Sequence, residues 1–404
     1  MAAFAALLRR GATTYALTIG DEFSPPSLDA EIAIIGGSGP SAPSLVRETM
    51  GTPTRMSVPL KFRQTTQALL QAEVDALDAY LRGGECTLEV SFTDAAAPTI
   101  WTVYHAQPVQ PAFTRHANNA HEVLQYTLSL VVSPFVAAAA ATLHDAKPIS
   151  APDSLSLAAM TGSYRSPLGI EVAAIGDATH SLYLAVDTED FDAYLADAAD
   201  LTWGTGATDT ADADARSGTA VYVRSLTAVA APLDTADYPE GPYLILARVK
   251  VRGGETGYIT TDRTKTIISF TRSSWHIVEL GTCYLPARRV RGGAAANLNV
   301  SVYGSSAASG KDACIDWVYP LPLGDGMLSY HPASATGSAA TIGRDADSGV
   351  TYVDDVANEE SVTGTTLMAL SGRLLVVAEA VAGADPTHAV AVTVTHTPRF
   401  AWMR

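Results

Sequence analysis

The residues best able to carry catalysis fall into short clusters, and each cluster lacks part of the pattern its chemistry needs. Gly36–Pro40 (GGSGP) is similar to the turn that exposes a nucleophilic serine, but proline takes the last position and no helical pattern follows Ser38. His105, His116 and His121 lie near one another, but no second histidine follows His121 at zinc-helix spacing. No phosphate-binding loop or dinucleotide fingerprint is present. We therefore predict no serine nucleophile, no zinc site and no cofactor.

Two acidic stretches raise the question of calcium. DTADADARSG contains Asp209, Asp212 and Asp214, and RDADSG contains Asp345 and Asp347. A helix-flanked calcium loop needs an acid at its twelfth position, and valine stands there in both stretches. We predict no metal site, with one structural calcium ion in a sandwich loop as the open alternative.

Carboxylate pairs could serve as the acid and base of a glycoside hydrolase. The chain is acidic, and nothing in its carboxylate spacing singles out one pair. The candidates are Glu189, Asp190, Asp192, Asp354, Asp355, Glu359 and Glu360. We predict that the chain is not an enzyme, and a hydrolase of cell-envelope polysaccharide stays the alternative.

Aromatic side chains could stack on the C–H face of a sugar ring. Trp203, Tyr222, Tyr243, Tyr258 and Trp275 are the candidates in the second half of the chain. Tyr243 and Trp275 lie in strongly apolar segments, which is typical of core positions. Trp203 and Tyr222 flank the acidic stretch at 209–214, so these two are the predicted ligand-binding residues.

Composition limits the class of protein that these residues can belong to. The 404 residues carry a formal net charge of −16, only 17% are charged and 47% are hydrophobic. These values exclude three classes of protein. A disordered chain needs more charge and less apolar content, a nucleic-acid-binding protein needs a basic surface, and a membrane-spanning protein needs about 20 apolar residues in a row. An apolar, acidic chain of this kind is typical of a subunit that buries surface against other subunits.

The cysteines and the N-terminus indicate where the chain is made. Cys86, Cys283 and Cys314 form no CxxC pair and cannot all pair, so we expect free, buried thiols from a reducing compartment. The apolar start, Met1 to Leu8, precedes Arg9 and Arg10, which is the reverse of a secretory signal. We expect synthesis and folding in a cytoplasm.

Alternating and helical patterns predict a mainly β protein with one amphipathic helix. Leucine and valine recur along one face over 66–82, between the capping threonines at 65–66 and a Gly-Gly end, and strands surround this helix in a domain over 1–135. Residues 136–152 are expected to be a connector, either a short helix or an extended tether. Many short strands over 153–323 predict a jelly roll, with a short helix near 188–197. Residues 324–404 are expected to form a further sandwich or to return to an earlier sheet.

Several stretches resemble one protein family. The order GPYLILARVKV (Gly241–Val251), WHIVELGTCYLP (Trp275–Pro286), LNVSVYG (Leu298–Gly304) and CIDWVYPLPL (Cys314–Leu323) is similar to the galactose-binding-like jelly roll in tail proteins of phages with long non-contractile tails. The closing VTVTHTPRFAW (Val392–Trp402) looks like the end of such minor tail proteins. Residues 1–135 resemble the belt domain of distal tail proteins.

This resemblance implies a function and a set of partners. It implies a structural virion protein at the phage tail tip, assembled in the host cytoplasm, whose belt domain closes a hexameric ring in the baseplate. The ring would join the tail tube protein to the central hub protein, and the jelly roll would project outward. A receptor-binding adhesin that holds a host-surface glycan is the alternative. Neither nucleic-acid binding nor membrane insertion is expected.

Overall fold

The computed structural model divides the chain into two compact units. Unit 1 comprises residues 1–139, 162–164 and 398–404, and unit 2 comprises residues 140–161 and 165–397. The residues that the structure describes are 4–17, 32–35, 45–48, 54–64, 66–92, 99–108, 112–114, 122–133, 136–138, 140–173, 181–189, 191, 194–235, 237–285, 297–331, 341–344, 350–354, 356–357, 362–378 and 388–400.

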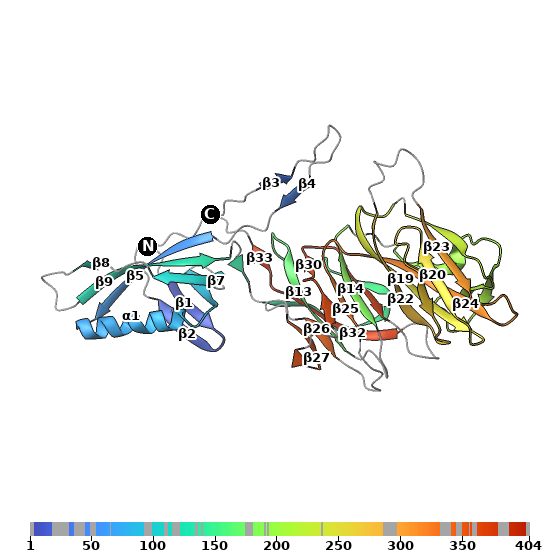
Figure 1. Cartoon of the computed structure of the whole chain (residues 1–404). Helices are drawn as coiled ribbons and strands as arrows, with labels where there is room; N and C mark the ends of the chain where they lie inside the picture. Colours follow the sequence, from blue (N-terminus) through green and yellow to red (C-terminus); the bar gives the residue numbers. More distant parts are fainter. Residues whose placement is uncertain are drawn as a thin grey trace. The chain divides into compact units, whose positions relative to one another are not determined.

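Unit 1 is a β-sheet with one α-helix along one face (Figure 1). Its strands are β1 (Phe4–Arg10), β2 (Thr13–Leu17), β5 (Thr54–Gln64), β6 (Cys86–Phe92), β7 (Thr99–Pro108), β8 (Ala112–Thr114), β9 (Glu122–Val132), β10 (Val136–Ala137) and β33 (Arg399–Phe400), and β3 (Ile32–Ile35) pairs with β4 (Leu45–Glu48) in a hairpin. The helix α1 spans Gln67–Leu81, within the predicted range 66–82.

The helix is fixed by a cap at its start and by leucines on one face. The Thr66 hydroxyl accepts a hydrogen bond from the Leu69 backbone N–H at 3.3 Å, which satisfies one free donor of the first turn. Leu70, Leu77 and Leu81 are buried against the sheet. Because these leucines repeat at helical spacing, a single apolar stripe holds the helix to the core.

Unit 2 contains two sandwiches, one inserted into the other. The outer sandwich has a seven-stranded sheet of β11 (Ala141–Ala151), β32 (His388–His396), β13 (Ser166–Ala173), β26 (Ile342–Arg344), β27 (Thr351–Val353), β28 (Val356–Ala357) and β30 (Met368–Ala369). Its five-stranded sheet, called the shared sheet below, contains β12 (Asp153–Ser156), β31 (Arg373–Ala378), β14 (Leu182–Asp187), β25 (Met327–Tyr330) and β29 (Val362–Gly364).

The inserted sandwich occupies residues 188–326. Its six-stranded sheet contains β15 (Ala196–Asp197), β16 (Ala207–Ala211), β17 (Thr219–Val223), β24 (Asp312–Pro322), β19 (Gly241–Arg252) and β22 (His276–Leu285), and its four-stranded sheet contains β18 (Val229–Asp234), β23 (Asn297–Gly304), β20 (Gly257–Thr261) and β21 (Ile268–Phe270). The insertion leaves and re-enters the outer sandwich at adjacent points, because Ala185 of β14 lies opposite Met327 of β25.

The shared sheet contacts a hydrophobic core on each face. Leu182 and Leu184 of β14 belong to the core of the outer sandwich, whereas Tyr183 and Ala185 between them belong to the core of the inserted sandwich. Every residue of β14 is buried. Since successive side chains of a strand point to opposite faces, an uninterrupted apolar run is what a doubly covered strand requires.

The structure confirms the predicted mainly β fold, with β-sandwiches and one α-helix among the residues described. It divides the chain at other boundaries than those predicted. Residues 141–151 of the expected connector form β11, which pairs with β32 and so belongs to a sheet. Residues 153–187 belong to the outer sandwich rather than to the jelly roll. Of the two alternatives for 324–404, the return to an earlier sheet is the one observed, because β31 and β32 pair with β12, β14, β11 and β13.

The segment 188–197, where a short helix was expected, contains no α-helix among its described residues. The Asp187 carboxylate accepts hydrogen bonds from the backbone N–H groups of Glu189 and Phe191 at 3.1 and 2.8 Å. A short 3₁₀ helix, η1, follows at Ala198–Asp200. Across the described residues, no helix combines the length and the apolar character needed to cross a membrane.

Candidate functional site

The two predicted ligand-binding residues lie in separate clusters and use their polar groups inside the protein. Trp203 packs against the core of the inserted sandwich, and its indole Nε1–H donates to the Ala198 carbonyl oxygen at 2.7 Å. Tyr222 packs beside Trp275, and its hydroxyl donates to Asp212 Oδ2 at 2.7 Å. Both side chains are half-buried. The structure therefore does not bring Trp203 and Tyr222 together into one stacking surface.

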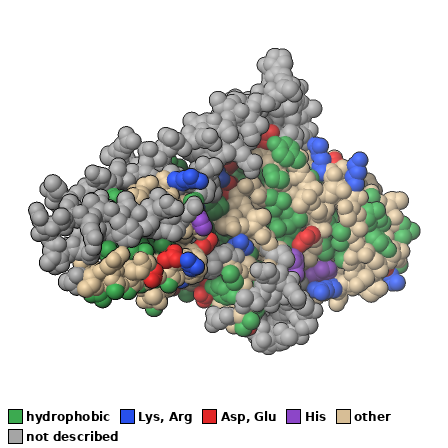
Figure 2. All heavy atoms as spheres, turned by 60° about the vertical axis from the view of Figure 1, so that its left-hand side comes forward, with side chains coloured by type: hydrophobic (Ala, Val, Ile, Leu, Met, Phe, Trp, Pro, Cys, Tyr) green, Lys and Arg blue, Asp and Glu red, His purple; other side chains and the backbone are tan. Residues whose placement is uncertain are grey.

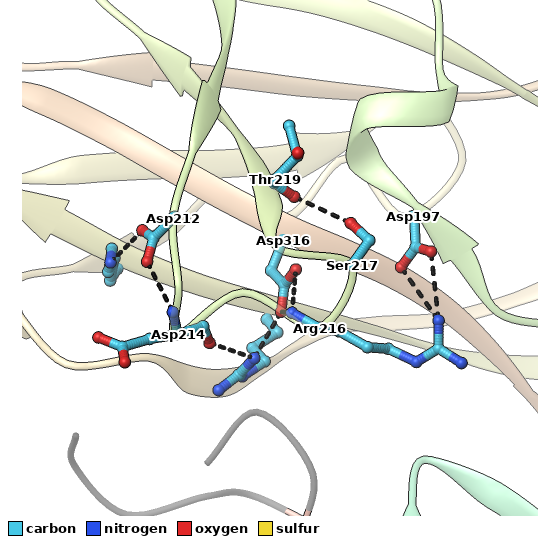
Figure 3. A network of polar contacts seen from close by, with 9 residues as sticks. Asp197, Asp212, Asp214, Arg216, Ser217, Thr219 and Asp316 are labelled. Carbon is cyan, nitrogen blue, oxygen red and sulfur yellow. Dashed lines mark hydrogen bonds and ion pairs between the residues drawn. The ribbon is translucent and has the colours of Figure 1, made fainter. Parts of the chain in front are cut away.

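Tyr222 contacts, through Asp212, a network of charges on the outward face of the six-stranded sheet. Figure 3 shows the part of this network that includes Asp212 and Asp316. Asp212 forms an ion pair with Lys250, and Lys250 Nζ lies 4.4 Å from the centre of the Trp275 ring. Burial alone would raise the pKa of the Asp212 carboxyl, but the hydrogen bonds from Lys250 and Tyr222 outweigh it and hold that pKa below its usual range. Buried charges of this kind persist only when each has a partner.

A second buried pair lies beside the first. Arg248 donates to Asp316 Oδ2 at 2.5 Å, and their side chains are only 6% and 0% exposed. Asp316 also accepts from the Arg216 backbone N–H at 3.1 Å, while the Arg216 guanidinium contacts Asp197 at 3.2 Å (Figure 3). The loop that follows β16 is thereby fastened over the sheet. This face is a closed structural surface.

The same contacts bear on the calcium alternative. Asp212 is engaged with Lys250 and Tyr222, and its Oδ1 accepts the Asp214 backbone N–H at 3.0 Å. Among the described residues, no group of three or more His, Cys, Asp or Glu side chains is placed to hold a metal ion. Ser38, His116, His121, Asp345 and Asp347 lie outside the described residues. So do Asp190, Asp192, Asp355, Glu359 and Glu360 of the carboxylate candidates, which leaves Glu189 and Asp354 as described members of that set.

A small pocket lies beside Arg216, where the two sandwiches of unit 2 meet. Its volume is about 220 Å³, and its lining includes Phe191, Tyr194, Tyr319 and Arg373. The Tyr194 hydroxyl donates to buried Asp187, and burial raises the pKa of Tyr194 and of Tyr319. These rings already pack on one another, because Tyr194 contacts the rings of both Phe191 and Tyr319.

The outward face of the four-stranded sheet has a different character. Tyr258 of β20 lies opposite Tyr303 of β23, and their rings are stacked, with centres 4.8 Å apart and planes 16° apart. Beside them along the strands, Thr260 lies opposite Ser301, and Ser301 lies opposite exposed Ala230. Tyr258 was one of several aromatic candidates in the sequence, but Tyr303 was missed. The alternation in LNVSVYG places Tyr303 outward and was the signal available for it.

Charge is dispersed on the face of the molecule that Figure 2 presents. Acidic and basic side chains of the described residues lie scattered among hydrophobic and uncharged ones, and they form no patch of one sign there. The net charge of −16 therefore does not translate into a single acidic surface on this face.

Comparison with known proteins gives no match to any protein-family model and none to a curated protein. Solved structures with similarity include the C-terminal carbohydrate-binding module of a laminarinase from Zobellia galactanivorans, with 14% identity, a TM-score of 0.22, and coverage of 31% of this chain and 97% of that one. The Dit protein of phage SPP1, a hub protein of Gram-positive-infecting phages, aligns with 8% identity, a TM-score of 0.29, and coverage of 79% and 99%. SGBP-B from a complex xyloglucan utilization locus of Bacteroides uniformis aligns with 10% identity, a TM-score of 0.21, and coverage of 56% and 95%. At these TM-scores the likenesses do not establish a common fold.

Proposed function

We propose that the chain is a structural subunit of a phage tail tip, a distal tail subunit of the baseplate ring that links the tail tube to the central hub. The observation that supports this most is the division into a small helix-backed β unit and a separately cored double sandwich. The resemblance of the sequence implies a belt domain followed by an outward jelly roll, and unit 1 and the inserted sandwich are the parts that would correspond to these two.

Unit 1 offers a surface that suits contact between copies. A groove of about 520 Å³ lies beside the end of α1, and its lining includes Leu81, Val103 and Tyr104. Tyr104 is 45% exposed, and Leu69 at the start of the helix is 51% exposed. Large exposed apolar side chains on a unit with its own core favour burial against another subunit. A ring needs such a heterologous contact, repeated from copy to copy.

The proposal includes no catalytic activity and no cofactor. The buried acids near the sequence candidates are paired with Lys250, Arg248 and backbone N–H groups, so their contacts account for their burial without a substrate. The expected assembly is a ring of six copies of this chain, its expected partners are a tail tube protein and a tail hub protein, and its expected location is the virion.

The oligomeric state of the purified chain tests this proposal. Mass photometry should find a closed oligomer of the 42.2 kDa chain, with six copies expected, and negative-stain microscopy should show rings. Tyr104→Glu should shift the population toward monomer, whereas Tyr284→Glu, at a tyrosine 55% exposed on the inserted sandwich, should leave the rings intact. A chain that stays monomeric and that antibodies do not find in purified virions would overturn the proposal.

A further inference from the structure

The two outward faces of the inserted sandwich are used unequally. The face of the six-stranded sheet is closed by Trp275, by the loop at 212–217 and by two buried ion pairs. The shared sheet packs on the same sandwich through Tyr183, whose hydroxyl donates to Glu279 at 3.1 Å. On the four-stranded sheet, by contrast, Ala230, Pro232 and Ser269 all point outward and are exposed. As far as the described residues show, the second face is the one open to a ligand.

This open face combines an aromatic pair with small polar neighbours. It is called the platform below and is defined by Ala230, Tyr258, Thr260, Asn299, Ser301 and Tyr303. The inward positions of the same strands, such as Ile259 and Val302, are fully buried, so the backbone beneath the platform is held by the core. The phenolic hydroxyls of Tyr258 and Tyr303 form no hydrogen bond to a described residue. The pair rises above the residues next to it, because Thr260, Ser301 and Ala230 have much smaller side chains.

Hydrogen-bonding groups line the low part of the platform. The hydroxyls of Thr260 and Ser301 lie at neighbouring positions on adjacent strands. Asn299, two residues before Ser301, is held from two sides by Asp262, which accepts from the Asn299 backbone N–H at 3.0 Å and from its side-chain Nδ2–H at 2.8 Å. The amide oxygen of Asn299 thus has a fixed orientation. Fixed polar groups beside an aromatic surface are the usual composition of a small-ligand site.

Charge decides what kind of ligand fits. The four strands β18, β20, β21 and β23 contain no lysine or arginine, and their one acidic residue is Asp234, at the end of β18. A polyanion would find no cation on these strands. A cationic peptide would find Asp234 and, just after β20, Asp262, which is already hydrogen-bonded to Asn299. A neutral polyol satisfies the hydroxyls and the amide without needing a counter-charge.

We propose that the platform binds a neutral glycan chain, with a pyranose ring beside the Tyr258–Tyr303 pair. The C–H groups of the ring would contact the aromatic surface, since their weakly positive hydrogens complement the negative face of a π system. The sugar hydroxyls would exchange hydrogen bonds with Thr260, Ser301 and Asn299. The inference uses the proposed function only for the source of the glycan, the host surface, and the binding itself does not depend on ring assembly.

Affinity electrophoresis of the purified full-length chain tests the platform. Native gels are cast with neutral dextran, β-glucan or galactan, with the neutral polysaccharide fraction of the host wall, or with anionic polygalacturonate. The wild-type chain should be retarded by at least one neutral polymer and not by polygalacturonate. Tyr258→Ala and Tyr303→Ala should each weaken retardation by about fivefold, because an aromatic contact of this size contributes roughly 1 kcal/mol.

Matched variants separate binding from folding. Tyr258→Phe and Tyr303→Phe keep the stacked rings and should retain most of the retardation, while Tyr284→Ala removes an exposed tyrosine elsewhere on the same sandwich and should bind like wild type. Thermal unfolding checks that each variant is folded, and mass photometry reports ring assembly separately. Three outcomes would each overturn the proposal, whether or not rings form. The wild-type chain could show no retardation in any neutral gel, both alanine variants could be retarded as strongly as the wild type, or binding could be limited to polygalacturonate.

Discussion

Leu374 and Leu375 are adjacent in β31 but belong to different hydrophobic cores. Leu374 is fully buried in the core of the outer sandwich, and Leu375, 3% exposed, packs in the core of the inserted sandwich. One strand thus contributes to both cores, and each core depends on the position of the same backbone. We expect the two sandwiches to unfold together rather than as independent domains.

Alanine substitution of either leucine should reveal this coupling. Leu374→Ala and Leu375→Ala should each lower the free energy of unfolding by about 2–5 kcal/mol, through lost burial and a residual cavity. Trp203, Trp275 and Trp317 all lie in the inserted sandwich, so fluorescence in a Trp101→Phe and Trp402→Phe background reports on that part alone. The urea midpoint of this signal should fall for Leu374→Ala too. An unchanged midpoint in that variant would show that the sandwiches are independent.

The Asp212–Lys250 pair should be costly to break from one side. Lys250→Met removes the cation beside the Asp212 carboxylate, whose side chain is only 7% exposed. We expect the free energy of unfolding to fall by about 3–5 kcal/mol. The double variant Lys250→Met with Asp212→Asn should recover a large part of that loss, because no buried charge remains. Arg82→Met, which breaks the exposed helical pair with Asp78, is the control and should cost about 0.5 kcal/mol or less. Equal losses in the single and double variants would contradict this account.

Buried His276 should make the stability of unit 2 depend on pH. Burial lowers the pKa of its imidazole, and a hydrogen bond to the Ser274 carbonyl opposes this only in part. Above the unfolded-state pKa of about 6.5 both states are neutral, so the stability is fully present there. As the pH falls below that value, the unfolded chain takes up a proton first and the free energy of unfolding declines.

Urea midpoints measured between pH 7.5 and 5.5 check this dependence. His276→Gln should show a shallower decline than the wild type, and His105→Gln, at an exposed histidine of unit 1, should leave the decline unchanged. Parallel curves for the wild type and His276→Gln would mean that other groups set the pH dependence.

The three thiols should differ in reactivity. Cys86 and Cys314 are buried, and desolvation raises the pKa of both thiols, that of Cys314 to about 12. Cys283 is partly exposed, although burial raises its pKa as well. A thiol-reactive dye should label Cys283 slowly in the native protein and all three cysteines after unfolding. Cys283→Ser should abolish the native reaction, and rapid labelling of a second cysteine would show that a core opens readily.

The parts of the fold that local patterns determine could be predicted from the sequence. The leucine spacing and Thr66 defined α1, and the alternation in LNVSVYG defined β23. The partners of the strands were not predictable, because pairing joins distant residues. Ala151 lies opposite His388, and Ala185 lies opposite Met327 across the whole insertion. The Ala-rich run near 137–141 gave no periodic signal that distinguishes a tether from the start of β11.

The place of the proposed platform could not be predicted from the sequence. Trp203 and Tyr222 were chosen because they flank an acidic stretch, but that stretch folds over the sheet and engages Tyr222 through Asp212. Which outward face stays open depends on where the loop at 212–217 lies, and a sequence read locally does not contain that information. Tyr258 and Tyr303, 45 positions apart in the numbering, become a pair only through the register of β20 and β23.

The return of β33 to unit 1 has a consequence for how the protein is made. β10 pairs with β7 on one side and with β33 on the other, so the second pairing of residues 136–137 needs residues 399–400. A ribosome adds residues from first to last, and all of unit 2 is therefore synthesised before this pairing can form. Most of unit 1 is synthesised first, but its sheet is complete only when β33 has been made. A truncated product that ends before residue 399 leaves one edge of β10 unpaired. Such an edge invites strand pairing with other nascent chains, so completion of the chain itself protects unit 1 from association before its synthesis ends.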